Sequence, residues 1–148
     1  MNIRLLTIAD VEEASQLIKG VSEIYTRKDF SEEGYEKFQS TVLFEGMSKN
    51  LTDGFFYWGA YENEQMVGMI AIKRPAHLFN LFVHQDHQGK GIASKLWEYA
   101  LSQLNPKQVT VFSSTYAVGL YEKLGFVQSG DKIENNEIIC YPMLWSAD

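Results

Sequence analysis

Residues 88–94, Gln-Gly-Lys-Gly-Ile-Ala-Ser, have the composition and position of an anion-binding loop. They follow a strand-like run, His77 to Val83, and precede apolar residues at helical spacing. Glycines just before a helix let backbone N–H groups converge on an anion with no Cβ in the way, and the helix dipole adds positive potential there. The segment therefore predicts a pyrophosphate cradle, with a tight strand-to-helix turn as the plain alternative.

Two known nucleotide-binding fingerprints do not fit this loop. A Walker A loop needs a glycine five residues before its Gly-Lys pair and Ser or Thr after it, and these positions hold His84 and Gly91. The dinucleotide fingerprint would place Ser94 at its third small position, with no acidic residue about twenty residues further on. A small nucleotide-binding α/β domain is therefore disfavoured.

The remaining reactive side chains form no paired motif. Three histidines and one cysteine give no metal-ligand spacing, so no metal site is expected. Cys140 cannot form an internal disulfide and has no histidine near it in sequence. We interpret it as a buried small apolar residue rather than a nucleophile.

The first half of the chain predicts a strand, two helices and a hairpin. A strand at residues 3–6 is followed by a capping-box pattern, Thr7 to Asp10, and a helix reaching Val21. A second helix begins at Ser31 and continues past residue 47 to a turn at 50–54. The aromatic and apolar runs 55–61 and 66–73 predict a β-hairpin.

The second half continues with alternating strands and helices. Strand 77–83 precedes the glycine loop, and Asn105-Pro106 ends the helix that begins at residue 92. A strand at 109–112, a helix at 114–124 ended by Gly125, and strands at 126–132 and 138–144 complete the chain. This order predicts an α/β (α+β) fold, a mixed sheet with helices packed on it.

Composition limits the class of protein. With 45% hydrophobic and 22% charged residues and no repeat or linker, the 148 residues predict one globular domain spanning 1–148. The N-terminus predicts neither a signal peptide nor a membrane span, so a cytoplasmic protein without a membrane partner is expected.

Charge is divided unevenly along the chain. Residues 1–64 carry six Lys/Arg against twelve Asp/Glu, whereas residues 65–148 carry seven of each. No basic stripe is present, so a nucleic-acid partner is not expected. The acidic half is either a solvated surface or a surface that attracts cations.

The pattern Gln88-x-x-Gly91-x-Ala93, after a strand ending Leu81-Phe82-Val83, resembles the coenzyme A signature of the GNAT N-acetyltransferase superfamily. The stretch from Ala117 through Tyr121 to Phe126 is similar to the second hallmark of that family. The order of elements resembles the GNAT fold over essentially the whole chain. The resemblance implies a mostly antiparallel central sheet of about seven strands flanked by about four helices.

What the resemblance implies is an N-acetyltransferase that uses acetyl-CoA as cosubstrate and transfers acetyl directly to a primary amine in a ternary complex. The central strand, residues Leu81, Phe82 and Val83, would contact the pantetheine arm and polarise the acetyl carbonyl. Tyr121 would protonate the departing thiolate, with a core aromatic as the plain alternative. The residues implied in the pyrophosphate cradle are Gln88, Gly89, Lys90, Gly91, Ile92, Ala93 and Ser94.

Two positions depart from the family pattern. Ser114 stands where asparagine is common, and its hydroxyl can still make one hydrogen bond to the cofactor. Asn80 stands where many members have a carboxylate base, and an amide takes no proton at neutral pH. The candidates for the missing base are His77 and His84, or instead a water held by Asn80 that relays the amine proton to Glu45 or to Tyr57. Strand alternation places His77 on the face opposite Asn80 unless a bulge intervenes.

Two functions from different classes follow. The first is the N-acetyltransferase, acting as a monomer or homodimer on a small or lysine-like amine, with a cationic acceptor favoured by the acidic half. The second is a catalytically weak GNAT-fold module that binds acyl-CoA as a sensor, which Asn80 in place of an acid would explain.

Overall fold

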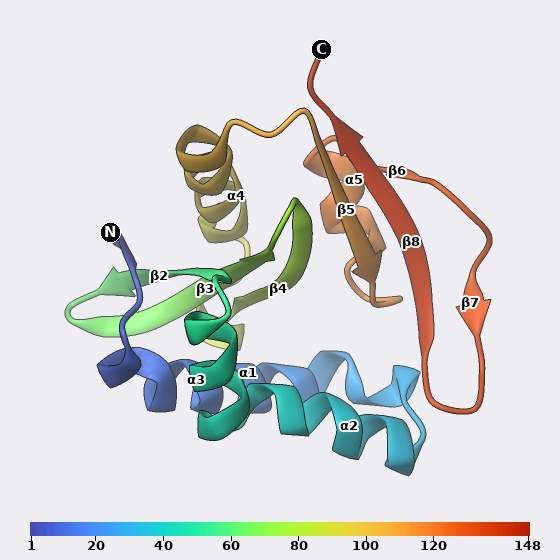
Figure 1. The fold of residues 1–148 in the computed structure, drawn as a ribbon, viewed down its shortest axis with the longest axis horizontal. Helices are drawn as coiled ribbons and strands as arrows, with labels where there is room; N and C mark the ends of the chain where they lie inside the picture. The colour runs from blue at the N-terminus through green and yellow to red at the C-terminus, as the bar shows by residue number, and fades with distance from the viewer.

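The computed structural model describes residues 1–148, which form one eight-stranded mixed sheet with five α-helices packed on it (Figure 1). The strand order is β1-β2-β3-β4-β5-β8-β6, with β7 paired to β8. The strands are β1 (Asn2–Leu5), β2 (Phe56–Glu62), β3 (Gln65–Lys73), β4 (His77–Val83), β5 (Gln108–Ser113), β6 (Val127–Gln128), β7 (Ile133–Glu134) and β8 (Ile139–Ser146). All pairs are antiparallel except β4 with β5, so the predicted mostly antiparallel sheet is confirmed, with one strand more than expected.

The helices cover both faces of the sheet. They are α1 (Val11–Tyr25), α2 (Glu32–Val42), α3 (Phe44–Thr52), α4 (Ile92–Leu104) and α5 (Val118–Lys123). Helices α1, α2 and α3 lie on one face, and α4 lies on the other (Figure 1). None of these helices combines the length and the apolar content that a membrane span requires.

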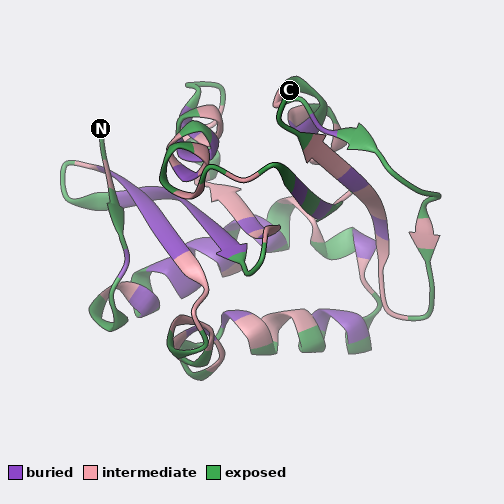
Figure 2. Cartoon of the chain, turned by 45° about the horizontal axis from the view of Figure 1, so that its top comes forward, coloured by how far each residue is buried: buried purple, intermediate pink, exposed green.

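Two hydrophobic cores result, one on each face of the sheet, and Figure 2 shows the buried residues concentrated on the central strands and on the inner faces of the helices. Helix α1 buries Val11, Leu17 and Ile18 at helical spacing against the residues of β2 and β3 that face it. Helix α4 buries Leu96 and Trp97 against the opposite face. Strand alternation therefore divides β2 and β3 between the two cores.

The capping residues in the first half of the sequence correctly predict where the first two helical segments begin. Thr7 and Asp10 form the predicted capping box, and the Ser31 side chain accepts from the Gly34 amide at 3.0 Å. The prediction of one long second helix was wrong, because the helix breaks at Leu43 into α2 and α3. The carbonyl of Val42 accepts the buried Ser15 hydroxyl of α1 instead of an amide of a continuing helix.

The first of the two closing strands is also shorter than predicted, whereas the second, predicted at 138–144, is observed as β8 (Ile139–Ser146). The expected strand 126–132 reduces to β6, and a separate two-residue strand, β7, follows it. Opposite the end of β6, Pro142 of β8 accepts from the Ser129 amide but has no N–H to return the bond. The ladder therefore stops at Pro142, and the chain leaves the sheet. The predicted helix 114–124 likewise begins only at Val118, after a turn that starts at Ser114.

One irregularity of the sheet creates an opening. Strands β4 and β5 pair only at His77 with Thr110 and at Leu78 with Val111. Beyond Leu78 the two strands diverge, as the space between them in Figure 1 illustrates. The remainder of β4 therefore has a hydrogen-bonded neighbour, β3, on one side only.

Candidate active site

The loop between β4 and α4 adopts the conformation that the glycines predicted. Gly89 and Gly91 have φ values of +79° and +80°, a region that L side chains rarely adopt, and Gly91 is the N-cap of α4. None of the backbone amides from Gln88 to Ser94 donates a hydrogen bond within the protein. These donors meet at the positive end of the α4 dipole, so the loop can bind a phosphate group.

The space above the two glycines is open. A Cβ added to Gly89 or to Gly91 would meet no atom within 4 Å. Side chains at these positions would therefore project into free space above the loop rather than into the protein core. The residues present fit a pyrophosphate such as that of coenzyme A, because the glycines leave this space empty and the amides supply its donors.

Strand β4 presents backbone groups to the opening between β4 and β5. The His84 amide donates to the Val67 carbonyl at 2.8 Å, so His84 and, by alternation, Phe82 bond toward β3. The backbone groups of Leu81 and Val83 then face the opening. The Val83 carbonyl already accepts from Nε2 of Gln88 at 3.1 Å, which fixes the first residue of the loop against the strand.

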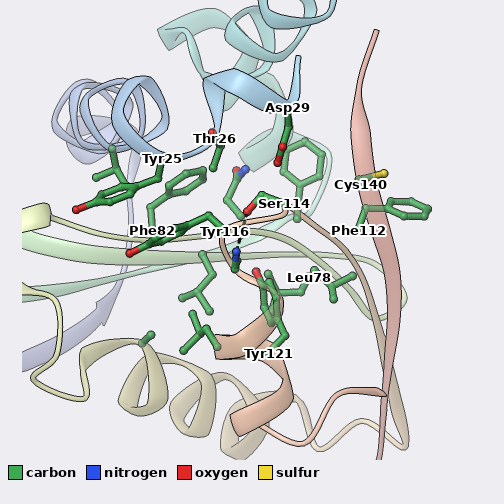
Figure 3. Close-up of a pocket in the computed structure, with 18 of the residues that line it drawn as sticks. Tyr25, Thr26, Asp29, Leu78, Phe82, Phe112, Ser114, Tyr116, Tyr121 and Cys140 are labelled. Carbon is green, nitrogen blue, oxygen red and sulfur yellow. Dashed lines mark hydrogen bonds between the residues drawn. The ribbon is translucent and has the colours of Figure 1, made fainter. Parts of the chain in front are cut away.

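A cavity of about 1020 Å³ joins the loop, the opening and the N-terminal helices. Every residue that the sequence placed in the cofactor site lines this cavity except Lys90, whose side chain is exposed. The wall opposite the loop comes from α1, α2 and the turn between them. Figure 3 shows Asp29 and Tyr121 entering the cavity from opposite sides.

Tyr121 is both a core residue and a cavity residue. Its ring packs edge-on against Phe126, with ring centroids 5.3 Å apart, and 5% of the residue is exposed. Burial raises the pKa of its hydroxyl above the ordinary value of 10.0, so the group stays protonated at neutral pH. The two interpretations of Tyr121 are therefore compatible, since the core holds the ring while the residue lines the cavity.

A bulge in β4 changes the faces that alternation assigned. Ala71 pairs with Asn80 and Ile72 with Leu78, so Phe79 is the extra residue. The bulge places His77 and Asn80 on the same face of the sheet. His77 lines the cavity, and its Nδ1 lies 2.7 Å from Oγ1 of Thr110. Burial, with a smaller effect of Lys73, lowers the pKa of His77, which keeps the ring neutral at pH 7.

Asn80 is an enclosed polar residue. It is 5% exposed and lines the cavity, and its Oδ1 atom has no hydrogen-bond partner. Buried polar atoms usually have a partner. The amide therefore retains one acceptor for a water molecule or a substrate N–H group.

Three of the candidate bases lie outside the cavity. Tyr57 is fully buried in the core beneath α1, where its hydroxyl accepts from Asn50 at 3.1 Å and burial raises its pKa. Glu45 is exposed on α3, and His84 accepts from the Asp86 amide at 3.1 Å. None of the three lines the cavity, so among the histidine, carboxylate and tyrosine candidates only His77 remains in place.

Ser114 and Cys140 also line the cavity. The Ser114 hydroxyl accepts from the Ala117 amide at 3.2 Å, which forms the turn before α5 and leaves its own proton free to donate. Burial, and then the charge of Asp29, raises the pKa of the Cys140 thiol. The thiolate is therefore disfavoured, in agreement with a cysteine that packs rather than reacts.

Sequence reasoning missed two cavity residues, Asp29 and Tyr116. Tyr116 stacks on Tyr25 with centroids 4.4 Å apart and donates to Oε1 of Gln88 at 2.8 Å. It thereby connects the turn before α5 to the glycine loop across the opening. The contacts of both residues join distant parts of the chain, and no local sequence pattern reports such pairs.

If the loop binds the pyrophosphate of acetyl-CoA, as the resemblance implies, Tyr116→Phe, which keeps the stacked ring and removes the bond to Gln88, is predicted to raise the KM for acetyl-CoA about two- to tenfold. The reason is that Gln88 loses one of the two hydrogen bonds that hold its side chain. Steady-state kinetics at saturating amine check this, and kcat should stay near the wild-type value. An unchanged KM would show that the Tyr116 hydroxyl bond does not position the loop.

The chain resembles known proteins both in sequence and in fold. The family described as "Acetyltransferase (GNAT) domain" matches residues 26–147. No curated protein sequence matches this chain.

Solved structures of low sequence identity share the fold. A GCN5-related N-acetyltransferase from Rhodopseudomonas palustris superposes with a TM-score of 0.84 at 22% identity, over 99% of this chain and 95% of that one. The PaiA N-acetyltransferase of Thermoplasma acidophilum, in complex with coenzyme A, gives 0.73 at 21% identity over 99% and 100%. An aminoglycoside 6'-N-acetyltransferase complexed with coenzyme A gives 0.75 at 13% identity over 99% and 97%.

The sequence match covers the glycine loop, the diverging strands and Tyr121, and it extends over most of the chain. The superpositions cover nearly the whole fold, including β1 and helix α1, which lie outside the matched range. On these findings, the chain belongs to the GNAT acetyltransferase family.

Proposed function

We propose that residues 1–148 form one acetyl-CoA-dependent N-acetyltransferase domain, which moves an acetyl group to a primary amine by direct transfer in a ternary complex. The observation that carries the proposal is the single cavity that contains the glycine loop, the free edge of β4 and Tyr121. Two of the structural neighbours were solved with coenzyme A, which supports acetyl-CoA as the cosubstrate.

Backbone groups would make most of the contacts with acetyl-CoA. The amides from Gln88 to Ser94 would hold the pyrophosphate at the N-terminus of α4. The backbone groups of Leu81 and Val83 would hold the pantetheine arm and orient the acetyl carbonyl, and their N–H groups would stabilise the negative charge that develops on its oxygen. When bound, acetyl-CoA supplies the acetyl group as an activated thioester.

Side chains would carry out the two proton transfers, one to the thiolate and one from the amine. Tyr121 is held protonated by burial, so it would donate its hydroxyl proton to the thiolate as the carbon–sulfur bond breaks. The amine must lose a proton, and Asn80 would accept a hydrogen bond from the amine or from a relay water. His77, neutral and on the same face as Asn80, is the group on β4 that could take that proton.

Two kinetic observations test direct transfer. Initial rates measured over both substrates should give intersecting double-reciprocal lines, because both substrates must be bound before acetyl moves. The intact mass of the protein after incubation with acetyl-CoA alone should show no acetyl adduct. Parallel lines together with an acetylated Cys140 would contradict the proposal and indicate a covalent intermediate.

The acceptor is proposed to be a small cationic amine. Helices α1 and α2 wall the cavity opposite the glycine loop, and they belong to the half of the chain with net charge −6. Much of that charge, including Glu12, Glu32, Glu33 and Glu36, is exposed, Glu13 accepts from the Met66 amide at 2.8 Å, and none of these five residues lines the cavity. These residues therefore act on an acceptor through a long-range field rather than by contact.

We predict that kcat/KM for a cationic amine falls about threefold as salt is raised from about 0.01 to about 0.1 M, where the screening length shortens from about 30 to about 10 Å. A neutral amine of similar size should show no comparable decrease. An acceptor screen at the two salt concentrations checks this. A preference for neutral or acidic amines, insensitive to salt, would mean that the acidic half is only a solvated surface.

The alternative is a GNAT-fold module that binds acyl-CoA without turnover. Asn80 in place of a carboxylate favours it, because the amide cannot accept a proton at neutral pH. Such a module would bind acetyl-CoA but would release no CoA thiol in response to any amine.

A further inference from the structure

Asp29 is a buried carboxylate without a cationic partner. It ends the short turn between α1 and α2, is 6% exposed and lines the cavity. Its Oδ2 accepts from the Thr115 amide at 2.8 Å, and no hydrogen bond in the structure includes its Oδ1. A buried carboxylate is costly unless it is paired with a positive charge. Asp29 therefore has one oxygen available for a ligand.

The other charged groups of the cavity do not supply that positive charge. Lys37 forms a salt bridge with Glu137 instead. The Nδ1 atom of His87 lies 3.5 Å from Oε2 of Glu62. Lys123 also lines the cavity, but no salt bridge in the structure includes Asp29. Asp29 is also the only acidic residue of the first 64 that lines the cavity.

A second, independent observation points to the same kind of ligand. The Oδ1 atom of Asn80, on β4, is an enclosed acceptor without a donor. Two walls of one cavity thus present hydrogen-bond acceptors that the protein does not satisfy. An ammonium group has three N–H donors, a positive charge and no acceptor, so it matches these walls better than an anion or an alcohol does.

Much of the cavity lining is aromatic. The rings that line the cavity include Tyr25, Phe30, Phe38, Phe82, Phe112 and Tyr116. Phe30 and Phe38 are 5.3 Å apart between centroids, and Phe38 and Phe82 are 6.5 Å apart. Aromatic faces attract cations and also bury apolar groups. Of the two acids that line the cavity, Glu137 is paired with Lys37, so only Asp29 is without a cationic partner. One unpaired acid beside aromatic rings suits one positive charge on an apolar body, whereas a polycation would need further unpaired acids.

We propose that Asp29 is the residue that recognises the acceptor, and that the acceptor class is a primary monoamine carried on an apolar or aromatic body. The inference rests on the proposed function and adds to it the residue that selects the substrate and the shape of that substrate. Asp29 acts by binding the ammonium ion of the incoming acceptor, so its contribution appears in the KM of the amine.

Two amines of nearly the same shape test the role of the charge. At neutral pH 2-phenylethylamine is a cation, whereas O-benzylhydroxylamine is neutral. Asp29→Asn keeps an oxygen that can accept from Thr115 and removes only the charge. We expect this variant to lower kcat/KM for 2-phenylethylamine about 10- to 100-fold, mainly through KM, and to change kcat/KM for O-benzylhydroxylamine less than about threefold.

Glu98→Gln is the matched control, because it removes one acidic charge at an exposed position of α4, outside the cavity and outside the acidic half of the chain. It should leave both amines near their wild-type values. An equal loss for both amines in Asp29→Asn would mean that Asp29 only holds the turn before α5. No loss for either would also overturn the proposal.

A binding measurement separates this inference from the proposed function. Calorimetry with 2-phenylethylamine and the protein saturated with CoA should show binding by the wild type that Asp29→Asn weakens about 10- to 100-fold. That result would support Asp29 as the recognition residue even if no acetyl transfer occurred, in which case only the proposed function would fail. Absence of amine binding by the wild type would overturn the inference, whatever other amines are acetylated.

Discussion

Gly91→Glu is expected to abolish acetyl-CoA binding while the fold survives. Gly91 has a φ of +80°, its Cβ would project into open space above the loop, and a carboxylate there would lie where phosphate oxygens are proposed to bind. Juxtaposed like charges cost several kcal/mol, so the dissociation constant for acetyl-CoA should rise by about 100-fold or more. Calorimetric titration measures this loss, and circular dichroism with thermal unfolding reports the fold.

Two controls separate charge from backbone strain at Gly91. Asn and Asp have nearly the same size and both tolerate the left-handed region, so Gly91→Asn and Gly91→Asp differ chiefly in charge. Gly91→Asp should bind acetyl-CoA much more weakly than Gly91→Asn. Gly20→Glu places the same side chain at an open glycine of α1 and should bind normally. If folded Gly91→Glu kept wild-type affinity, the glycines would serve only the turn.

Tyr121→Phe is expected to lower kcat by about 10²- to 10⁴-fold, the range of general acid catalysis. The substitution keeps the ring packed against Phe126 and removes only the hydroxyl, so acetyl-CoA affinity and thermal stability should change little. Steady-state kinetics with calorimetry check both quantities. Tyr99→Phe, on α4 against Trp58 and outside the cavity, is the matched control and should keep full activity.

The pH dependence of kcat gives a second test of Tyr121. Burial raises the pKa of this hydroxyl above 10.0, and the proton it donates is therefore present throughout the neutral and mildly alkaline range. Loss of this acid should reduce kcat only at pH values above the ordinary tyrosine range. A Tyr121→Phe enzyme with unaltered turnover would remove Tyr121 from the chemistry.

Features that depend on local sequence could be predicted. The glycines at 89 and 91, the capping box at Thr7 and Asp10 and the Asn105-Pro106 stop each determine the backbone within a few residues. The glycine loop and the limits of α4 therefore agree with the sequence. The order of strands and helices followed from periodicity, and the family resemblance then gave the sheet.

Features that depend on contacts between distant residues could not be predicted. The break at Leu43 depends on Ser15 reaching the Val42 carbonyl, and the early end of β6 depends on Pro142 in a strand that comes later in the chain. The place of Asp29 in the cavity could not be predicted for the same reason, because its carboxylate accepts from the Thr115 amide, 86 positions away in the sequence. Tyr57 was proposed as a base because its type allows proton transfer, but β2 turns it into the core.

We propose that a bound amine takes the acetyl group from acetyl-CoA on this protein. The most direct measurement is the release of CoA thiol with and without 2-phenylethylamine, with mass spectrometry of the amine product. We expect release that depends on both the protein and the amine, with one N-acetylated amine formed for each thiol. Tight acetyl-CoA binding without amine-dependent release, across a panel of cationic and neutral amines, would contradict the claim and identify the protein as an acyl-CoA-binding module.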